Sequence, residues 1–213
     1  MTTSNDRLLF LRVCKPGGFA YSDRSNGFKW PLSVGTTVTA PDWNPRPECG
    51  NGLHGLKWGT GDSSLIPRHE DSVGLVFSAD PVDCVDIDGG QKSKVRTARI
   101  EFVGTLASAA TWLATQTGRA GVHFATVAVP GNGTASAGYG GTASAGYEGT
   151  ATAGNGGTAS AGDYGTASAG ERGEIRIRYY DGTRYRTAIG YVGEDGILAG
   201  GAYRVENGKF VKV

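Results

Sequence analysis

The chain has few of the residues that would indicate a disulfide framework, a membrane span or a charged partner. Its 213 residues include three cysteines, Cys14, Cys49 and Cys84, an odd number at wide spacing that does not indicate a disulfide framework. Charged residues make up 19% and the formal net charge is +1, so we expect no bulk nucleic-acid binding. No apolar run approaches the roughly 18 residues that a membrane span requires. We therefore expect no membrane association.

The beginning of the chain also lacks the pattern of a secretory signal. The segment MTTSNDRLLFLRVC contains no basic run followed by an apolar core and a small-residue cleavage site. These absences together predict a soluble protein of the cytoplasm.

Glycine, in contrast, is abundant. It accounts for 36 of the 213 residues, against a typical share near 7%. Twelve of these glycines belong to an eight-residue unit that recurs five times without a gap over residues 133–172: GTASAGYG, GTASAGYE, GTATAGNG, GTASAGDY and GTASAGER. The first six positions barely vary and the last two vary freely. A fixed short period predicts a stacked repeat architecture, in which each unit is a strand followed by a turn.

The residues that flank the repeats indicate which side chains point inward. Val127 and Val129 before the repeats, and Ile175 and Ile177 after them, occupy the third and fifth octad positions, where the repeats carry alanine. Strand side chains alternate between two faces. The alanines should therefore point inward and the threonines and serines outward, in a thin β-solenoid that larger apolar residues plug at each end.

The length of one coil follows from the length of the unit. One strand and one turn use all eight residues, so we predict a closed coil of two octads, or about 16 residues. Thr134, Thr150 and Thr166 should then stack on one face, and Thr142 and Thr158 on the other, about 4.8 Å apart per coil. Such a short stack needs caps.

The rest of the chain is expected to supply these caps. We predict a β-rich head over residues 1–124 with one helix near residues 105–117, the octapeptide solenoid over 125–172, and a C-terminal antiparallel β cap over 173–213. Thr105 is a suitable N-cap for the helix. The predicted fold class is mostly β.

Within the cap, the sequence predicts a hairpin with a three-residue loop at Asp181–Thr183. This register places Ile175 opposite Ile189 and Tyr179 opposite Tyr185, which gives the hairpin an apolar face.

The most distinctive local motif lies in the head, where Cys49 precedes His54 by five residues with glycines between them. A thiol and an imidazole brought together can act as nucleophile and base. Both are also metal ligands, but the spacing fits no zinc pattern, so we assign neither a metal nor a cofactor. The alternative is a buried cysteine before a glycine turn, with the histidine opening the next strand.

Residues near this motif and on the repeats are candidates for binding. Asp42, Trp43 and Glu48 form either a binding edge or a loop that the tryptophan fixes by packing. The variable octad tips could vary the contacts with a partner on a fixed frame; they include Tyr139, Glu148, Asp163 and Tyr164.

Two further groups of charged residues leave alternatives open. Arg176, Arg178 and Arg186 form either a phosphate-binding stripe or solvated outward positions. Aspartates from Asp80 to Asp88 alternate with apolar residues, which favours a half-buried strand over a calcium loop.

The octad resembles the repeats of bacterial ice-nucleation proteins. It shares their Ala-Gly-Tyr-Gly phrase, here at 137–140, and their Thr-x-Thr spacing, here Thr150-Ala151-Thr152; the other units carry serine in place of the second threonine. This resemblance covers about 40 residues and implies a solenoid with an outward rank of threonines.

The order of parts along the whole chain resembles a group of phage and prophage proteins. They share a Cys-x-x-Gly-Phe/Leu-His head motif, here at residues 49–54, then tandem octads, then a β tail that ends like residues 203–211. This resemblance implies a phage-related protein built on a capped solenoid, located in the host cytoplasm.

Three hypotheses of function follow. The first is a non-enzymatic binding protein on a β-solenoid scaffold, because the octads hold no group for acid–base or nucleophilic work beyond unactivated hydroxyls. Its expected partner is a host protein or a small host nucleotide, and the chain could form a homo-oligomer. The alternatives are an enzyme that uses Cys49 and His54, and an ice-binding array of threonines.

Overall fold

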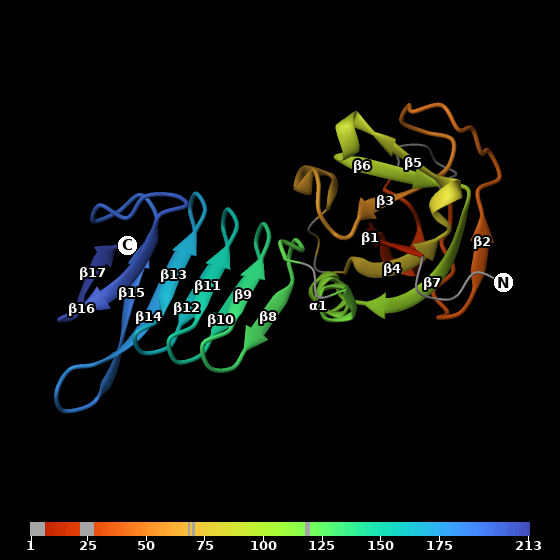
Figure 1. Cartoon of the computed structure of the whole chain (residues 1–213). Coiled ribbons are helices and arrows are strands. Elements are labelled where there is room, and N and C mark those ends of the chain that lie inside the picture. The colour runs from red at the N-terminus through yellow and green to blue at the C-terminus, as the bar shows by residue number, and fades with distance from the viewer. Residues whose placement is uncertain (1–6, 22–27, 68, 70, 118–119) are drawn as a thin grey trace. The chain divides into compact units, whose positions relative to one another are not determined.

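The computed structural model describes residues 7–21, 28–67, 69, 71–117 and 120–213. The chain divides into two compact units, Met1–Thr117 and Gly118–Val213 (Figure 1). The predicted fold class is confirmed: the structure is mostly β, with a solenoid, one helix among the described residues and an antiparallel sheet.

The first unit, which we call the head, is built on a seven-stranded sheet in which every strand pair is antiparallel. The strands follow one another in the sheet in the order β2-β7-β4-β1-β3-β6-β5. Their bounds are β1 (Leu8–Cys14), β2 (Thr37–Thr39), β3 (Leu53–Lys57), β4 (Val73–Ala79), β5 (Cys84–Ile87), β6 (Lys92–Val95) and β7 (Thr97–Gly104). Short 3₁₀ turns lie between them: η1 (Pro16–Gly18), η2 (Ser63–Leu65), η3 (Pro81–Asp83) and η4 (Asp88–Gly90).

One helix, α1 (Leu106–Thr117), covers the residue range that the sequence predicted and packs against β4, β1 and β7. Its N-terminus is capped as expected, because the backbone N–H of Ser108 donates to Oγ1 of Thr105 at 3.1 Å. The core of the head is aromatic: the rings of Phe10 and Phe77 stack with centroids 4.9 Å apart, and Trp30 packs against Phe77 at 5.0 Å.

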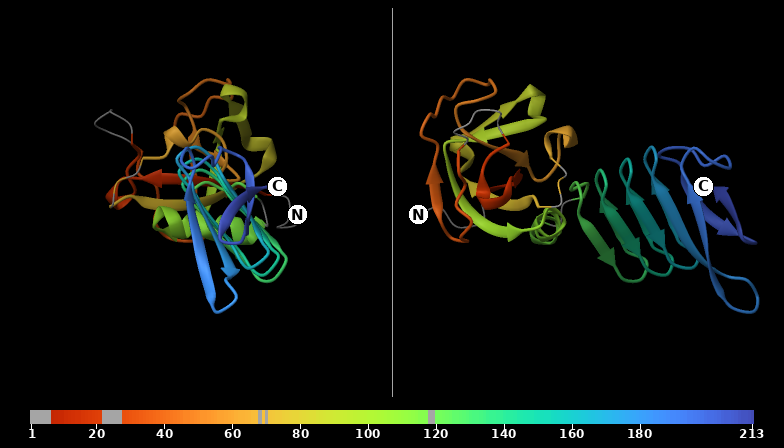
Figure 2. Two further views of the ribbon diagram at one scale, coloured as in Figure 1. Left: turned by 90° about the vertical axis from the view of Figure 1, so that its left-hand side faces the viewer. Right: turned by 180° about the vertical axis from the view of Figure 1, so that it is seen from behind.

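The octads of the second unit form the predicted solenoid, with alternate strands in two parallel sheets (Figure 1). One sheet contains β8 (Thr126–Val129), β10 (Thr142–Ala145) and β12 (Thr158–Ala161); the other contains β9 (Thr134–Ala137), β11 (Thr150–Ala153) and β13 (Thr166–Ala169). Thr142 pairs with Thr158, and Thr150 with both Thr134 and Thr166, which confirms the coil of 16 residues. The right-hand view of Figure 2 shows the same stacked strands from behind.

The inward and outward assignment is also confirmed. All alanines at the third octad position, from Ala135 to Ala167, are fully buried, whereas the threonine and serine positions are half-buried or exposed. Ile175 and Ile177 fill the interior at the C-terminal end, and Val127 and Val129 pack against the same core at the other end.

The invariant glycines of the octad follow from the closeness of the coils. A Cβ added to Gly157, at the first position, would lie 2.7 Å from the carbonyl oxygen of Gly141 in the preceding coil; one added to Gly162, at the sixth, would lie 2.6 Å from the backbone of Gly146. The eighth position has a different requirement. It has a left-handed backbone whether it is Gly156 (φ 64°) or Tyr164 (φ 59°), so glycine is favoured there by conformation alone.

The C-terminal cap continues both sheets, but its hairpin register differs from the prediction. Strand β14 (Glu174–Tyr180) pairs in parallel with β12 and antiparallel with β15 (Tyr185–Tyr191). Ile175 lies opposite Gly190 rather than Ile189, and Tyr180, not Tyr179, lies opposite Tyr185. The predicted three-residue loop is therefore wrong.

The loop has four residues because Asp181 closes it. The Asp181 carboxylate accepts the backbone N–H groups of Thr183 and Arg184, and its own N–H donates to the Arg184 carbonyl. On the inner face, glycine at position 190 leaves room for two side chains of the cap, since a Cβ there would lie 2.3 Å from Cδ1 of Ile197 and 2.8 Å from the ring of Phe210.

The chain ends in a second hairpin of β16 (Ala202–Glu206) and β17 (Lys209–Lys212), and β16 pairs antiparallel with β13. Its turn, Asn207-Gly208, has positive φ at both residues, as a two-residue hairpin turn requires. Ile197 and Tyr203 are buried against the isoleucines of β14, so the cap closes the apolar interior at this end.

The narrow interior leads to a stability prediction. Replacing Ala159 by Leu should lower the free energy of unfolding by about 1–3 kcal/mol, because the added methyl groups overpack a filled lumen. Replacing the adjacent Thr158 by Val should change it by less than about 0.5 kcal/mol, because that side chain points outward. Urea denaturation of both variants checks this, and a greater loss from Thr158→Val would contradict the assignment.

Candidate functional site

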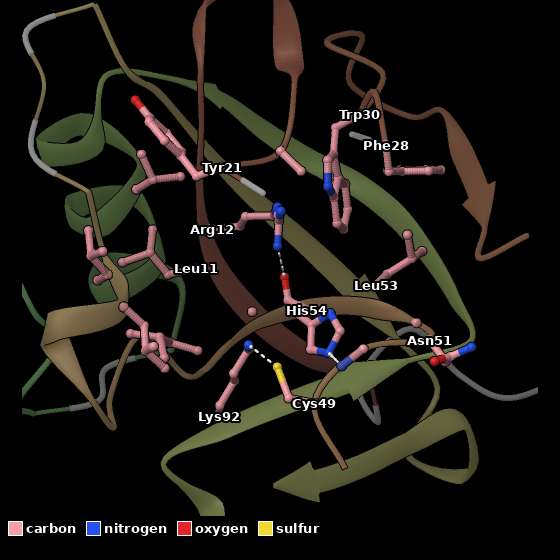
Figure 3. A pocket seen from close by; sticks show the side chains of 18 of the residues that line it. Leu11, Arg12, Tyr21, Phe28, Trp30, Cys49, Asn51, Leu53, His54 and Lys92 are labelled. Atoms are coloured by element: carbon pink, nitrogen blue, oxygen red, sulfur yellow. Dashed lines mark hydrogen bonds between the residues drawn. The ribbon is translucent and has the colours of Figure 1, made fainter. Parts of the chain in front are cut away.

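The head contains a cavity of about 870 Å³ next to the Cys49–His54 motif (Figure 3). Its walls come from β1, the start of β3, the loop that precedes β3 and the segment that follows β1. Residues that sequence reasoning did not select line it, among them Arg12, Tyr21, Trp30 and Lys92. The sequence carried one signal for them, since Arg12 interrupts an otherwise apolar strand.

The loop before β3 is shaped by a buried lysine. Lys94 is 1% exposed, and its ammonium group donates to the backbone carbonyls of Glu48 at 2.9 Å and Gly50 at 3.1 Å. The amide of Asn51 donates to the carbonyl of Asp42 across the same loop. These bonds fold a segment without strands into a fixed wall of the cavity.

His54 is held by its own loop. Its Nε2 atom accepts the backbone N–H of Gly50 at 3.3 Å. The pKa of His54 is lowered to about 3, mainly by burial and further by the positive charges of Lys92, Arg12 and Lys94. The imidazole is therefore neutral at physiological pH.

Cys49 is exposed, so the alternative of a buried cysteine is wrong, and its hydrogen bond is with Lys92 rather than His54. The ammonium of Lys92 lies 3.2 Å from its sulfur atom. The structure thus brings Cys49, His54 and Lys92 to one cavity, with the lysine next to the thiol and the imidazole turned to the Gly50 backbone (Figure 3). The catalytic role of the Cys49–His54 pair stays a prediction.

Arg12 lies deep in the cavity. Its Nη1 donates to the backbone carbonyl of His54 at 2.7 Å, and its guanidinium lies over the ring of Trp30, 4.8 Å from the centroid. Its Nε is buried and has no hydrogen-bond partner among the described residues. Burial raises the pKa of the nearby Cys14 thiol, and Arg12 opposes this rise.

Three loop residues were proposed as a binding edge, Asp42, Trp43 and Glu48, and each has different surroundings in the head. Asp42 lines the cavity and is exposed. Trp43 packs against the core of the head and lies over Gly52, where a Cβ would meet its ring at 3.2 Å. Glu48 is exposed and contributes its carbonyl to Lys94.

The aspartates from Asp80 to Asp88 do not form one continuous strand. Asp80 caps the turn η3 by accepting the N–H of Val82, and the strand begins only at Cys84. Asp86 accepts from Lys57 and Ser93. In the part of the chain that the structure describes, no three His, Cys, Asp or Glu side chains gather as a metal site.

A second candidate site is the outer surface of the solenoid, where hydroxyl side chains form rows across the coils. On the sheet of β9, β11 and β13, a first row consists of Thr134, Thr150 and Thr166 and a second of Ser136, Thr152 and Ser168. The other sheet has corresponding rows, which include Thr142 with Thr158 and Ser144 with Ser160.

The variable octad tips lie at the two edges of the solenoid. Tyr139 is half-buried and packs edge-on against Phe124 at 5.6 Å. Glu148 and Asp163 lie at the opposite edge, joined by a bond from the N–H of Glu148 to the carbonyl of Asp163. Tyr164 is 73% exposed and packs against the ring of Tyr147.

The corrected hairpin register separates the arginines of the cap. Arg176 and Arg178 lie opposite Ile189 and Thr187, whereas Arg186 lies opposite Tyr179, on the other face of the sheet. Arg176 pairs with Glu174, and Arg178 lies 4.1 Å from the centroid of the Tyr185 ring. The structure therefore does not bring the three arginines into one stripe.

Arg186 has its own partner in the hairpin loop. It pairs with Asp181, and the backbone N–H of Arg184 and the Arg186 guanidinium hold the pKa of that carboxyl at about 2.

Comparison with known proteins supports the repeat resemblance. Ice nucleation protein InaU of Pantoea ananas is 35% identical over 104 residues, which cover 49% of this chain and 10% of that protein. An ice nucleation protein of Enterobacter agglomerans is also 35% identical over 104 residues, 49% of this chain and 8% of that protein. The chain thus spans about a tenth of the length of these relatives.

No family model matches the chain, and no solved structure matches it significantly. Within the described residues, no helix is long and apolar enough to cross a membrane.

The low pKa of His54 leads to a prediction of acid sensitivity. The unfolded chain binds a proton at His54 below pH 6.5, whereas the folded chain binds it only near pH 3. The free energy of unfolding should therefore fall by up to about 1.4 kcal/mol per pH unit as the pH drops from 6.5 to 5, above the range where carboxylates titrate. Urea denaturation between pH 7.5 and 5 measures this slope.

The matched variant is His54→Gln, which can still accept the Gly50 N–H but takes up no proton. Its stability should decline less steeply over the same range. Equal slopes for the two proteins would contradict a buried, neutral His54.

Proposed function

We propose that the solenoid binds a regularly spaced surface through its outward rows of hydroxyl groups, and that this surface is ice. The observation that carries the proposal is the register of the coils, which places threonine over threonine and serine or threonine over serine on both sheets.

The spacing of these rows is set by the backbone. Neighbouring coils lie about 4.8 Å apart, and alternate residues of one strand about 6.6 Å apart, so each sheet presents a two-dimensional grid of hydroxyls. The rows on the β9–β11–β13 sheet contain the chain's Thr-x-Thr pair, Thr150 and Thr152, and both of these side chains are exposed. The grid is rigid because the coils stack backbone on backbone at the glycine positions.

The comparisons favour ice over other ordered surfaces, because the relatives whose sequences match about half of this chain are ice nucleation proteins. The 104 matched residues are a tenth or less of the length of each relative, and this chain contains five octads. A small grid can adsorb to an existing crystal more readily than it can organise a new one. We therefore expect adsorption to ice rather than strong nucleation.

The test is an assay of ice recrystallisation with the full chain, together with the freezing temperature of droplets. The unmodified protein should slow the growth of ice grains. The double variant Thr150→Lys, Thr152→Lys should lose this effect, because long charged side chains hold the surface away from the grid.

Glu171→Lys, at an exposed turn of the solenoid, is the matched control and should keep the activity. Circular dichroism should show that all variants are folded. If the unmodified protein leaves ice grains unchanged, the proposal is wrong. If the double variant slows them equally, the β9–β11–β13 sheet is not the surface that binds ice.

A second candidate function rests on the octad tips. Tyr147 and Tyr164 are 55% and 73% exposed, and their rings pack edge-on with centroids 5.8 Å apart on neighbouring coils. Tyrosine is enriched at protein interfaces, where it supplies a large contact area for few rotatable bonds. In this alternative the solenoid is the scaffold of a phage-related protein that binds a host protein in the cytoplasm.

Capture experiments with a host lysate test this alternative. The double variant Tyr147→Ser, Tyr164→Ser should lose a captured partner that the unmodified chain retains, whereas Thr150→Lys, Thr152→Lys should retain it. A partner held equally by both variants would exclude the tyrosine pair as the contact.

A further inference from the structure

We propose that the cavity of the head binds a phosphorylated aromatic small molecule of the nucleotide class. The proposal concerns a different unit from the solenoid and does not depend on the proposed function of the octads.

The first argument is the charge of the cavity wall. Arg12 and Lys92 both line it, and neither forms an ion pair with a carboxylate among the described residues. Asp42 is the acidic residue among those that line the cavity, and its side chain is exposed. Partly buried cations without a counter-charge are unfavourable unless an anion joins them.

The second argument is the incomplete hydrogen bonding of Arg12. Nη1 donates to the His54 carbonyl and the guanidinium also interacts with the Cys14 thiol, but Nε is buried without a hydrogen-bond partner in the part of the chain that the structure describes. A guanidinium has five N–H donors in a fixed plane that matches the oxygens of a phosphate. Lys92, whose ammonium contacts only the sulfur of Cys49 among its described hydrogen bonds, adds a second donor for the same anion.

The positive charges of three side chains act on one part of the cavity wall, around His54. The positive charges of Lys92, Arg12 and Lys94 all act on the imidazole of His54, so three cationic groups lie around this part of the cavity wall. Lys94 is buried, donates to two loop carbonyls and does not line the cavity, so it contributes charge while Arg12 and Lys92 contribute donors.

The third argument is the aromatic wall. Tyr21, Phe28 and Trp30 line the same cavity, and in Figure 3 the guanidinium of Arg12 lies between Tyr21 and Trp30. A flat ring fits against such side chains. The volume of about 870 Å³ is within the range of sites for molecules of nucleotide size.

Binding can be measured by calorimetry with the full chain. The probes are the four ribonucleoside 5′-monophosphates, the four corresponding nucleosides, and inorganic phosphate. At least one nucleotide should bind with a dissociation constant below about 1 mM, and at least tenfold more tightly than its nucleoside or phosphate alone.

Lys92→Gln should weaken this binding by about tenfold, because one charge-assisted hydrogen bond is lost. Arg12→Lys keeps the charge but removes the planar donors and should weaken it further. Arg96→Gln is the matched control, since it removes an exposed charge of the head that does not line the cavity. If Arg12→Lys does not fold, Lys92→Gln still tests the proposal by itself.

Several results would overturn the proposal. If no nucleotide binds at millimolar concentration, the site is not of this class. Equal binding of nucleosides would exclude the role of the cations, and equal binding of inorganic phosphate would exclude the aromatic wall. Unchanged affinity in Lys92→Gln would place the ligand elsewhere. Each result is independent of the ice assays.

Discussion

The close approach of one coil's backbone to the next is the constraint on which the solenoid depends. At the first and sixth octad positions no Cβ fits, since it would lie less than 3 Å from the backbone of the preceding coil, as at Gly157 and Gly162. This closeness stacks the coils in register, so that the buried alanines align inside and the hydroxyls align outside. The proposed grid for ice and the variable tips both follow from that one spacing.

The ends of the stack require larger side chains, because there the lumen is no longer covered by another coil. Ile175 and Ile177 take the alanine positions, and the cap covers them with Ile197 and Tyr203. The Tyr203 hydroxyl is satisfied by the N–H of Leu198 and the carbonyl of Gly196, so an aromatic ring can close the interior without an unpaired polar group.

In the head, cationic side chains hold irregular backbone in place by donating hydrogen bonds to its carbonyl groups. Lys94 gathers the carbonyls of the loop before β3, and Arg12 holds the carbonyl of His54. The Cys49–His54 motif thus marks a wall of the cavity, and its histidine contributes through its contact with Gly50. The repeats offer an extended surface and the head an enclosed one, which suit different ligands.

The sequence alone determined what depends on local periodicity: the strand phase of the octads, the 16-residue coil and the helix capped by Thr105. These patterns repeat or lie within a few residues, so short-range sterics decide them. The hairpin register depends on the Asp181 carboxylate, which closes a four-residue loop, and on the packing of the cap, where Gly190 rather than Ile189 lies opposite Ile175 beside Ile197 and Phe210. The cavity was decided by tertiary packing, since Arg12, Trp30, Cys49 and Lys92 meet only when distant strands pair. Separation along the chain hides such contacts from any local pattern.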